Sequence, residues 1–235
     1  MEKIIGIIGA MEEEVEKLIA QTDVTVTENV AGMEFRKGRL GGTEVVIVRS
    51  GMGKVNAAMC AQILISRYNA THLINTGFAG SLSNDLSIGD IVISSEAVQH
   101  DFDVSPIGFK KGEVPFTGLV AFTADDEVVK TACKVMSEAL PDVRIIPGRI
   151  CSGDQFISDK KAKDRICSEF GGLCCEMEGA AVAQVSYLNN VKFLIIRAVS
   201  DSADESAGED FNFSVFQSSV AEEFASAVTK LLPVV

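Results

Sequence analysis

Acidic side chains stand at the ends of two apolar segments in the second half of the chain. Residues 193–201 are apolar for most of their length and carry Arg197, Ser200 and Asp201 at or near the C-terminal end. Glu178 stands where a short apolar segment turns into a helix of small residues. In open α/β sheets, ligands bind beyond the carboxyl ends of the strands. These side chains therefore form a candidate site, although an acid at a helix start can also serve only to favour the helix N-terminus.

Other predicted strand ends carry glycine or acidic residues as well. They are Glu12-Glu13-Glu14, Ser50 to Gly53, Thr76 to Gly80 and Ser152 to Ile157. Loops at one edge of a sheet can assemble a single cleft. Carboxylates suit vicinal hydroxyls such as those of ribose, an aromatic ring such as Phe156 suits stacking on a planar base, and glycines let backbone amides approach. A nucleoside satisfies all three demands.

Cleavage of the glycosidic bond of a nucleoside requires two acidic groups in different environments. One protonates the leaving base, and the other activates a water molecule. Asp201 and one of the three glutamates at 12–14 could divide these roles. We expect the other two glutamates only to favour the start of a helix.

Segments with strand and helix patterns alternate along the chain. The predicted strands are 4–9, three within 24–50, 72–80, 89–95, 143–152 and 193–201, with a short one before Glu176, and the predicted helices are 12–20, 54–68, 125–139 and 160–170. A final helix would present an apolar stripe of Phe213, Phe216, Val220, Phe224 and Leu231. Alternation predicts parallel pairing and the early meander predicts antiparallel pairing, so we expect an α/β fold with a mixed sheet.

Composition narrows the class of protein. The 235 residues are 47% hydrophobic and contain no linker-like run, so we expect a single domain over 1–235. No apolar run approaches the ~18 residues of a membrane span. The net charge of −12, without clusters of Lys or Arg, disfavours a nucleic-acid partner. The N-terminus lacks the features of a signal peptide, so we expect a cytoplasmic protein.

Neither a metal nor a cofactor is expected. The six cysteines form no CxxC pair, and the chain has only two histidines. The stretch His100-Asp-Phe-Asp103 superficially resembles a metal-binding cluster, but partners for a complete site are missing. The glycines at 6–11 read Gly-Ile-Ile-Gly-Ala-Met, which is not the GxGxxG spacing of dinucleotide-binding folds.

Seven short motifs together carry a resemblance to a known family. They are GAMEEEV (9–15), SGMGKVNAA (50–58), NTGFAG (75–80), GDIVIS (89–94), SGDQFI (152–157), EME (176–178) and RAVSD (197–201). In this order the chain resembles the 5′-methylthioadenosine/S-adenosylhomocysteine nucleosidases of the purine nucleoside phosphorylase-like superfamily, over nearly its whole length. The resemblance implies a three-layer sandwich with a central mixed sheet flanked by helices. It also implies hydrolysis of 5′-methylthioadenosine and S-adenosylhomocysteine to adenine and a 5-thio-substituted ribose, as in methionine salvage and nucleoside catabolism.

The resemblance assigns roles to the acids of the candidate site. Glu14 matches the base that activates the hydrolytic water, and Asp201 matches the acid that protonates purine N7. Glu178 matches the residue that holds the ribose hydroxyls, and Met177 matches the one that packs under the sugar.

Further roles come from the same resemblance. Arg197 and Ser200 resemble supports for Asp201, while Phe156 and Ile157 resemble the pair that binds adenine, the first by stacking and the second through its backbone. These assignments predict one nucleoside pocket at the strand ends.

The 5′ group of the nucleoside should meet Met11, Met52 and Phe211, apolar residues suited to a thioether. Packing in the core is the alternative for the two methionines. The resemblance places Val104 and Ile107 at a homodimer contact, where the neighbouring subunit closes the 5′ end of the pocket.

The chain departs from the family pattern at one position, and three alternative functions remain. Phe78 stands where the family has Ser, which removes a hydroxyl near the ribose and adds bulk. Phosphorolytic relatives bind phosphate near the first loop with arginine, whereas this loop is Met11-Glu-Glu-Glu14, which would repel phosphate. A nucleosidase for another adenosine derivative, such as aminodeoxyfutalosine, is the second alternative. A binding protein without turnover is the third, but it would not need both Glu14 and Asp201.

Overall fold

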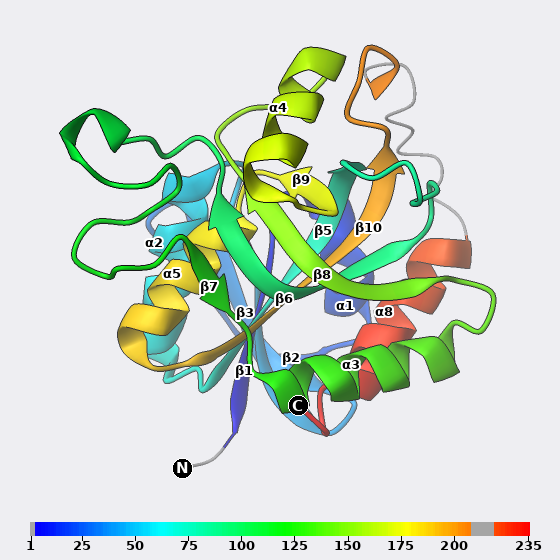
Figure 1. The fold of residues 1–235 in the computed structure, drawn as a ribbon. Helices are drawn as coiled ribbons and strands as arrows, with labels where there is room; N and C mark the ends of the chain where they lie inside the picture. Colours follow the sequence, from blue (N-terminus) through cyan, green and yellow to red (C-terminus); the bar gives the residue numbers. More distant parts are fainter. Residues whose placement is uncertain (1–2, 208–218) are drawn as a thin grey trace.

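A mixed sheet of ten strands forms the centre of the molecule (Figure 1). The computed structural model describes residues 3–207 and 219–235. The strands are β1 (Ile4–Gly9), β2 (Asp23–Val30), β3 (Met33–Leu40), β4 (Thr43–Arg49), β5 (His72–Ser81), β6 (Ile91–Gln99), β7 (Ala121–Thr123), β8 (Ile145–Ser152), β9 (Cys174–Glu176) and β10 (Lys192–Asp201). Their order is β10-β6-β8-β9-β5-β1-β4-β3-β2, with β7 paired to β6.

The sheet contains both parallel and antiparallel pairs of strands. β1 pairs in parallel with β4 and β5, and β8 pairs in parallel with β6 and β9. The meander of β2, β3 and β4 is antiparallel. β10 pairs in parallel with β5 and antiparallel with β6, so the sheet curls at this end. The expected α/β class with a mixed sheet is confirmed.

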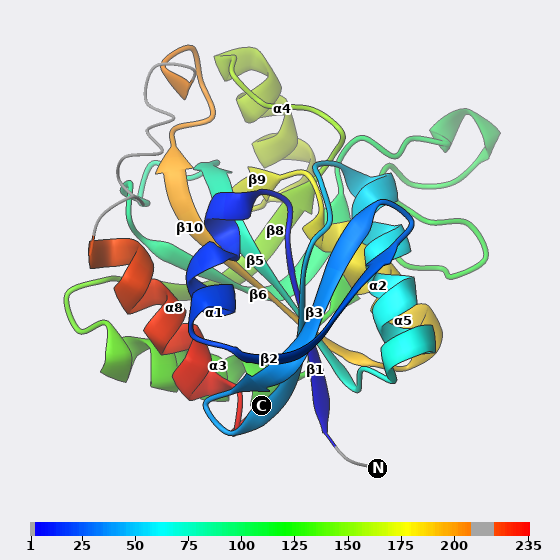
Figure 2. The same cartoon turned by 180° about the vertical axis from the view of Figure 1, so that it is seen from behind.

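Helices cover both faces of the sheet. They are η1 (Glu12–Glu14), α1 (Glu16–Ala20), α2 (Lys54–Tyr68), η2 (Ser105–Ile107), α3 (Asp126–Ala139), α4 (Lys160–Phe170), α5 (Gly179–Asn189) and α8 (Ser219–Leu231). Figure 2 shows α1, α3 and α8 together on one side and α2 and α5 together on the other. Each group buries its own apolar cluster against the sheet. The three layers thus follow from apolar strands that are buried on both faces.

Local sequence explains several element ends. The side chain of Asp125 accepts hydrogen bonds from the backbone amides of Glu127 and Val128 and so caps α3. α2 ends at Asn69, which adopts the left-handed conformation with φ 56°. Of the final helix, the structure describes Ser219–Leu231, and the part of the predicted stripe that includes Phe213 and Phe216 lies outside the described residues.

The structure corrects three boundaries. The predicted helix over 12–20 is instead η1 followed by α1, and it breaks at Val15, whose φ of −126° is not helical. β5 ends at Ser81, one residue beyond the predicted strand 72–80, and runs without a break through Gly77. β6 extends to Gln99, and the short β7 pairs with this extension. Within residues 3–207 and 219–235, no helix is long and apolar enough to cross a bilayer.

Candidate active site

One pocket at the carboxyl ends of β5, β9 and β10 gathers most of the predicted site residues. We call it the main pocket, and it encloses about 580 Å³. The predicted residues that line it are Met11, Glu14, Met52, Phe78, Phe156, Ile157, Met177, Glu178, Ser200 and Asp201. They come from segments far apart in the sequence, as expected for loops at one sheet edge.

Glu14 is held by backbone amides at the end of β1. Its Oε2 accepts hydrogen bonds from the amides of Ala10 (2.6 Å) and Met11 (2.9 Å), and its Oε1 accepts one from the amide of Phe78 (3.1 Å). These bonds to the side chain explain why the predicted helix breaks next to Glu14. Burial raises the pKa of Glu14, although the charge of Arg197 and the amides oppose this rise. A carboxylate with a raised pKa is suited to accept a proton from water.

Gly77 makes room for Glu14 on β5. A Cβ atom at this position would overlap both the Glu14 carboxylate and the Arg197 guanidinium. Any side chain here would therefore displace one of the two charged groups. The glycine is required by this close approach.

Glu178 precedes α5 and reaches across the pocket to the loop after β4. Its Oε1 accepts a hydrogen bond of 2.8 Å from the amide of Gly53, and its Oε2 lies 3.7 Å from Arg197 Nη2. Burial and the neighbouring Glu176 raise the pKa of Glu178 to about 7. The side chain lines the main pocket, where its oxygens can accept hydrogen bonds from hydroxyl groups.

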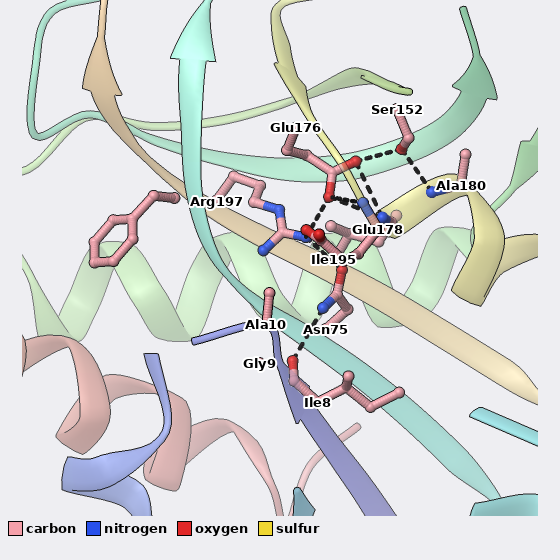
Figure 3. A network of polar contacts seen from close by, with 12 residues as sticks. Ile8, Gly9, Ala10, Asn75, Ser152, Glu176, Glu178, Ala180, Ile195 and Arg197 are labelled. Carbon is pink, nitrogen blue, oxygen red and sulfur yellow. Dashed lines mark hydrogen bonds and ion pairs between the residues drawn. The ribbon is translucent and has the colours of Figure 1, made fainter. Parts of the chain in front are cut away.

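Arg197 directs its hydrogen bonds to residues of other strands. Its guanidinium is fully buried and donates through Nη2 to Glu176 Oε2 and to Asn75 Oδ1 (Figure 3). Burial opposes the charge of Arg197, but the carboxylates of Glu176, Glu178 and Glu14 outweigh this effect and raise its pKa. Arg197 is thus paired with the glutamates, because a buried cation needs nearby anions.

Glu176, to which the sequence analysis assigned no role in the site, organises the turn beside Glu178. Its carboxylate accepts hydrogen bonds from the Ser152 hydroxyl, the amides of Glu178 and Gly179, and Arg197. The Ser152 hydroxyl in turn accepts a bond of 2.7 Å from the amide of Ala180. These contacts fix the turn from β9 into α5 on which Glu178 stands. The EME motif contained Glu176, but only the structure separates its contacts from those of Glu178.

Asp201 is oriented by its neighbours in sequence. The Ser200 hydroxyl donates to Asp201 Oδ2 (2.8 Å), and the amide of Ala203 donates to Oδ1 (2.8 Å). The register of β10 against β5 shifts between Val199 and Asp201, so that Ser200 forms a bulge. Consecutive strand residues normally point to opposite faces, and the bulge explains why Ser200 and Asp201 both line the main pocket. The predicted support by Ser200 therefore has a geometric basis.

Apolar side chains form the outer part of the main pocket. Phe156 and Met52 line it while remaining 53% and 61% exposed, whereas Ile157 is buried. The loop that carries Phe156 is fixed by Asp154, whose amide donates to Asp101 Oδ2 and whose Oδ1 accepts from the amide of Lys54. The rim is therefore apolar and accessible, but its backbone is tied to α2.

Four predicted residues are not among those that line the main pocket in the described part of the chain, and the fully buried Arg197 is one of them. Phe211 lies outside the described residues. Val104 is half-buried and Ile107 is 74% exposed, on or beside η2, and neither lines the pocket. A role for these two residues would require contact with another molecule.

The first loop carries more negative than positive charge. Arg49 is mostly exposed, and its Nη1 lies 3.6 Å from Glu12 Oε2. Glu13 and Glu14 follow directly. An arginine that is already paired with a carboxylate, in a loop with two further acids, is a poor site for phosphate.

The fold and the site define the class of this protein. The model of the Phosphorylase superfamily matches residues 4–233, and the chain belongs to this superfamily. A 5′-methylthioadenosine/S-adenosylhomocysteine nucleosidase of Shewanella loihica is 44% identical over 209 residues, which cover 88% of this chain and 90% of the relative. The resemblance inferred from the motifs is thereby confirmed.

Solved structures show the same likeness. A nucleosidase of that name from Neisseria meningitidis, in complex with methylthio-immucillin-A, has a TM-score of 0.92 and 35% identity and covers 99% of this chain and 100% of that one. The native futalosine hydrolase of Helicobacter pylori has a TM-score of 0.90 and 30% identity, with coverage of 99% and 98%.

Proposed function

We propose that this protein hydrolyses the N-glycosidic bond of 5′-methylthioadenosine and S-adenosylhomocysteine and releases adenine. One observation carries the proposal: Glu14 and Asp201 line the same pocket from different strand ends, and their hydrogen-bond partners differ. Two acids in different environments can act as base and acid on one substrate. The relatives and solved structures of this activity support the choice of substrate.

The reaction divides between the two acids. Asp201 donates a proton toward N7 of the purine as the bond between C1′ and N9 breaks, and the electron pair of that bond remains on the base. Glu14 accepts a proton from water, whose oxygen forms the new bond to C1′. Glu178 accepts hydrogen bonds from the ribose hydroxyls, and Phe156 stacks on the adenine.

Water, and not phosphate, is the proposed nucleophile. The acidic loop of Glu12, Glu13 and Glu14 and the pairing of Arg49 with Glu12 support this choice. Phosphate would have to approach three carboxylates, whereas a water molecule gains a proton acceptor. Hydrolysis yields a free ribose derivative, and phosphorolysis would yield a ribose 1-phosphate.

A related adenosine derivative, such as aminodeoxyfutalosine, is the second candidate substrate. The likeness to the futalosine hydrolase favours it, and so does the accessible outer end of the pocket at Met52 and Phe156. The first candidate is preferred because the curated relatives with more than 40% identity carry the nucleosidase name. The 5′ substituent alone separates the two substrates.

Release of adenine tests the proposal directly. The purified chain is incubated with methylthioadenosine, S-adenosylhomocysteine and aminodeoxyfutalosine, each with and without phosphate. We expect adenine release from the first two at a rate that does not depend on phosphate. Formation of a ribose 1-phosphate, or no adenine from any of the three, would contradict the proposal.

We also propose that the chain acts in the cytoplasm as a homodimer of single-domain subunits. Exposed apolar side chains at Met52, Val55, Ile107 and Phe116 support a contact on this side of the molecule. In a dimer, Val104 and Ile107 of one subunit would close the 5′ end of the other subunit's pocket. Sedimentation of the wild type and of Ile107→Asp tests this, and a monomeric wild type would contradict it.

A further inference from the structure

A second cavity lies behind the main pocket and shares two residues with it. We call it the rear chamber, and it is a small cavity of about 20 Å³ between η1, α1, β5 and α8. Glu14 and Phe78 line both cavities. The other described residues that line the rear chamber include Lys17, Leu18, Thr76 and Ala225. Glu14 therefore stands at the boundary between the two cavities.

Thr76 places a hydroxyl at the rear chamber. The residue is fully buried, and its Oγ1 has no hydrogen-bond partner among residues 3–207 and 219–235. Because side chains alternate along a strand, Thr76 points to the same face as Ile74, which packs in the cluster that contains Phe224 and Ala225 of α8. This is the face on which the rear chamber lies. A buried hydroxyl without a protein partner is normally satisfied by ordered water.

The chamber offers such water more than one polar partner. Glu14 lines it with a carboxylate that has remaining acceptor capacity, because its Oε1 takes only one backbone amide. Glu13 and Lys17 line the chamber as well, and both lie near the protein surface. A water site needs two to four polar partners, and the chamber provides them.

We propose that the rear chamber holds ordered water, bound by the Thr76 hydroxyl, and that it supplies the hydrolytic water to Glu14 from the side opposite the main pocket. This inference rests on the proposed hydrolysis. Each turnover consumes one water molecule, whose oxygen bonds to C1′ and whose proton passes to Glu14. Glu14 then passes that proton to a further water molecule of the rear chamber and so to solvent, while Asp201 regains its own proton from solvent. A bound nucleoside can fill the main pocket without blocking this route.

Thr76→Val tests the role of the hydroxyl, because valine keeps the shape and the β-branched side chain. We expect a loss of turnover of about tenfold with KM unchanged, and a shift to higher pH of the acidic limb of kcat/KM, since Glu14 loses its hydration. Thr76→Ser restores the hydroxyl and should recover most of the turnover. A lowered melting temperature with wild-type kcat would overturn the proposal.

Two further measurements keep the test independent of one variant. A crystal structure at a resolution that shows water should contain a water molecule on Thr76 Oγ1 in the wild type and none there in Thr76→Val. A dry chamber in the wild type would overturn the proposal whatever the activity.

Ala225→Leu fills the chamber and should lower kcat without changing KM. A wild-type kcat with the leucine seen in the chamber would also refute the proposal. A wild type that releases no adenine would instead refute the proposed function.

Discussion

The two walls of the main pocket differ in the kind of side chain that they contain and in how these side chains are held. The charged wall, comprising Glu14, Glu176, Glu178 and Arg197, consists of carboxylates around one buried guanidinium, tied by hydrogen bonds to strand ends. The apolar wall, comprising Met52, Phe156 and Ile157, stands on loops, and its first two members are more than half exposed. The energy of a buried charge depends strongly on its position relative to other charges, whereas the energy of an apolar contact depends mainly on the area that it buries.

This difference predicts that the two walls affect different kinetic parameters. Groups that interact with developing charge affect turnover, while groups that contact the substrate equally in the ground state and the transition state affect KM. Asp201 stands between the walls, with its side chain held by Ser200 and Ala203. We therefore expect substitutions in the charged wall and at Asp201 to lower kcat, and those in the apolar wall to raise KM. The following predictions begin with the largest effect.

Asp201→Asn should cause the largest loss, about a thousandfold in turnover with little change in substrate affinity. A purine leaves poorly as an anion, and proton transfer at N7 acts mainly in the transition state. Asparagine can still accept the hydrogen bond from the Ala203 amide, so the turn after β10 should survive. Single-turnover rate and melting temperature are measured on the same sample. A lower melting temperature with wild-type chemistry would show that Asp201 only stabilises the turn.

Glu14→Gln should lower turnover by about a hundredfold while nucleoside affinity is kept. Glu12→Gln is the matched control and should stay near the wild type. Burial raises the pKa of Glu14 above the ordinary value of 4.5, and the base must be deprotonated to act. Wild-type kcat/KM should therefore fall as the pH drops through this raised value, and the Gln variant should lose that limb. Equal losses in the two variants would mean that the assignment within 12–14 is wrong.

Glu176→Gln tests whether the charged wall acts as a unit. The change leaves the buried Arg197 without its nearest anion, which should lower the melting temperature by roughly 10 °C, since breaking a buried pair costs about 3–5 kcal/mol. Turnover should fall by about tenfold, and the pKa of Glu178 should drop from about 7 because a neighbouring charge is gone. An NMR titration of the Glu178 carboxyl measures this drop.

Glu96→Gln is the matched control for Glu176→Gln. It removes the carboxylate 2.8 Å from Arg149, in a pair whose side chains are about one-third exposed. Such pairs contribute about 0–1 kcal/mol, so the melting temperature should change by only a few degrees. Similar behaviour of the two variants would contradict the special role of the buried pair.

The sequence predicted most of the site because its motifs lie at strand ends. Ten of the predicted residues line one pocket, and the order of strands and helices follows from apolar runs. The resemblance gave Arg197 as a support for Asp201, and the structure adds that the guanidinium donates to Glu176 and Asn75. Partners that are 21 or more residues apart cannot be inferred from a local pattern.

Details of the backbone could not be predicted from the sequence either. The bulge at Ser200 directs two consecutive side chains toward the same pocket, and the residue types at this position do not indicate a bulge. The break at Val15 depends on amides that bind the Glu14 side chain, which competes with the helix for the same chain segment. The reason for a glycine at 77, within β5, was also not evident from the sequence, because it depends on Glu14 and Arg197, which occupy the space of its missing Cβ.

The smallest effect should come from the apolar wall, and Phe156→Ala tests it. Aromatic stacking contributes about 0.5–1.5 kcal/mol beyond area burial, which corresponds to a rise of roughly 2- to 13-fold in KM. kcat should stay within about threefold of the wild type, because the ring interacts with adenine before and during bond cleavage alike. The inhibition constant of adenine should rise by the same factor as KM. Phe156→Tyr keeps the ring and should behave as the wild type. A Phe156→Ala variant that loses turnover at unchanged KM would remove the distinction between the two walls, since the exposed ring would then act on the same step as the buried carboxylates.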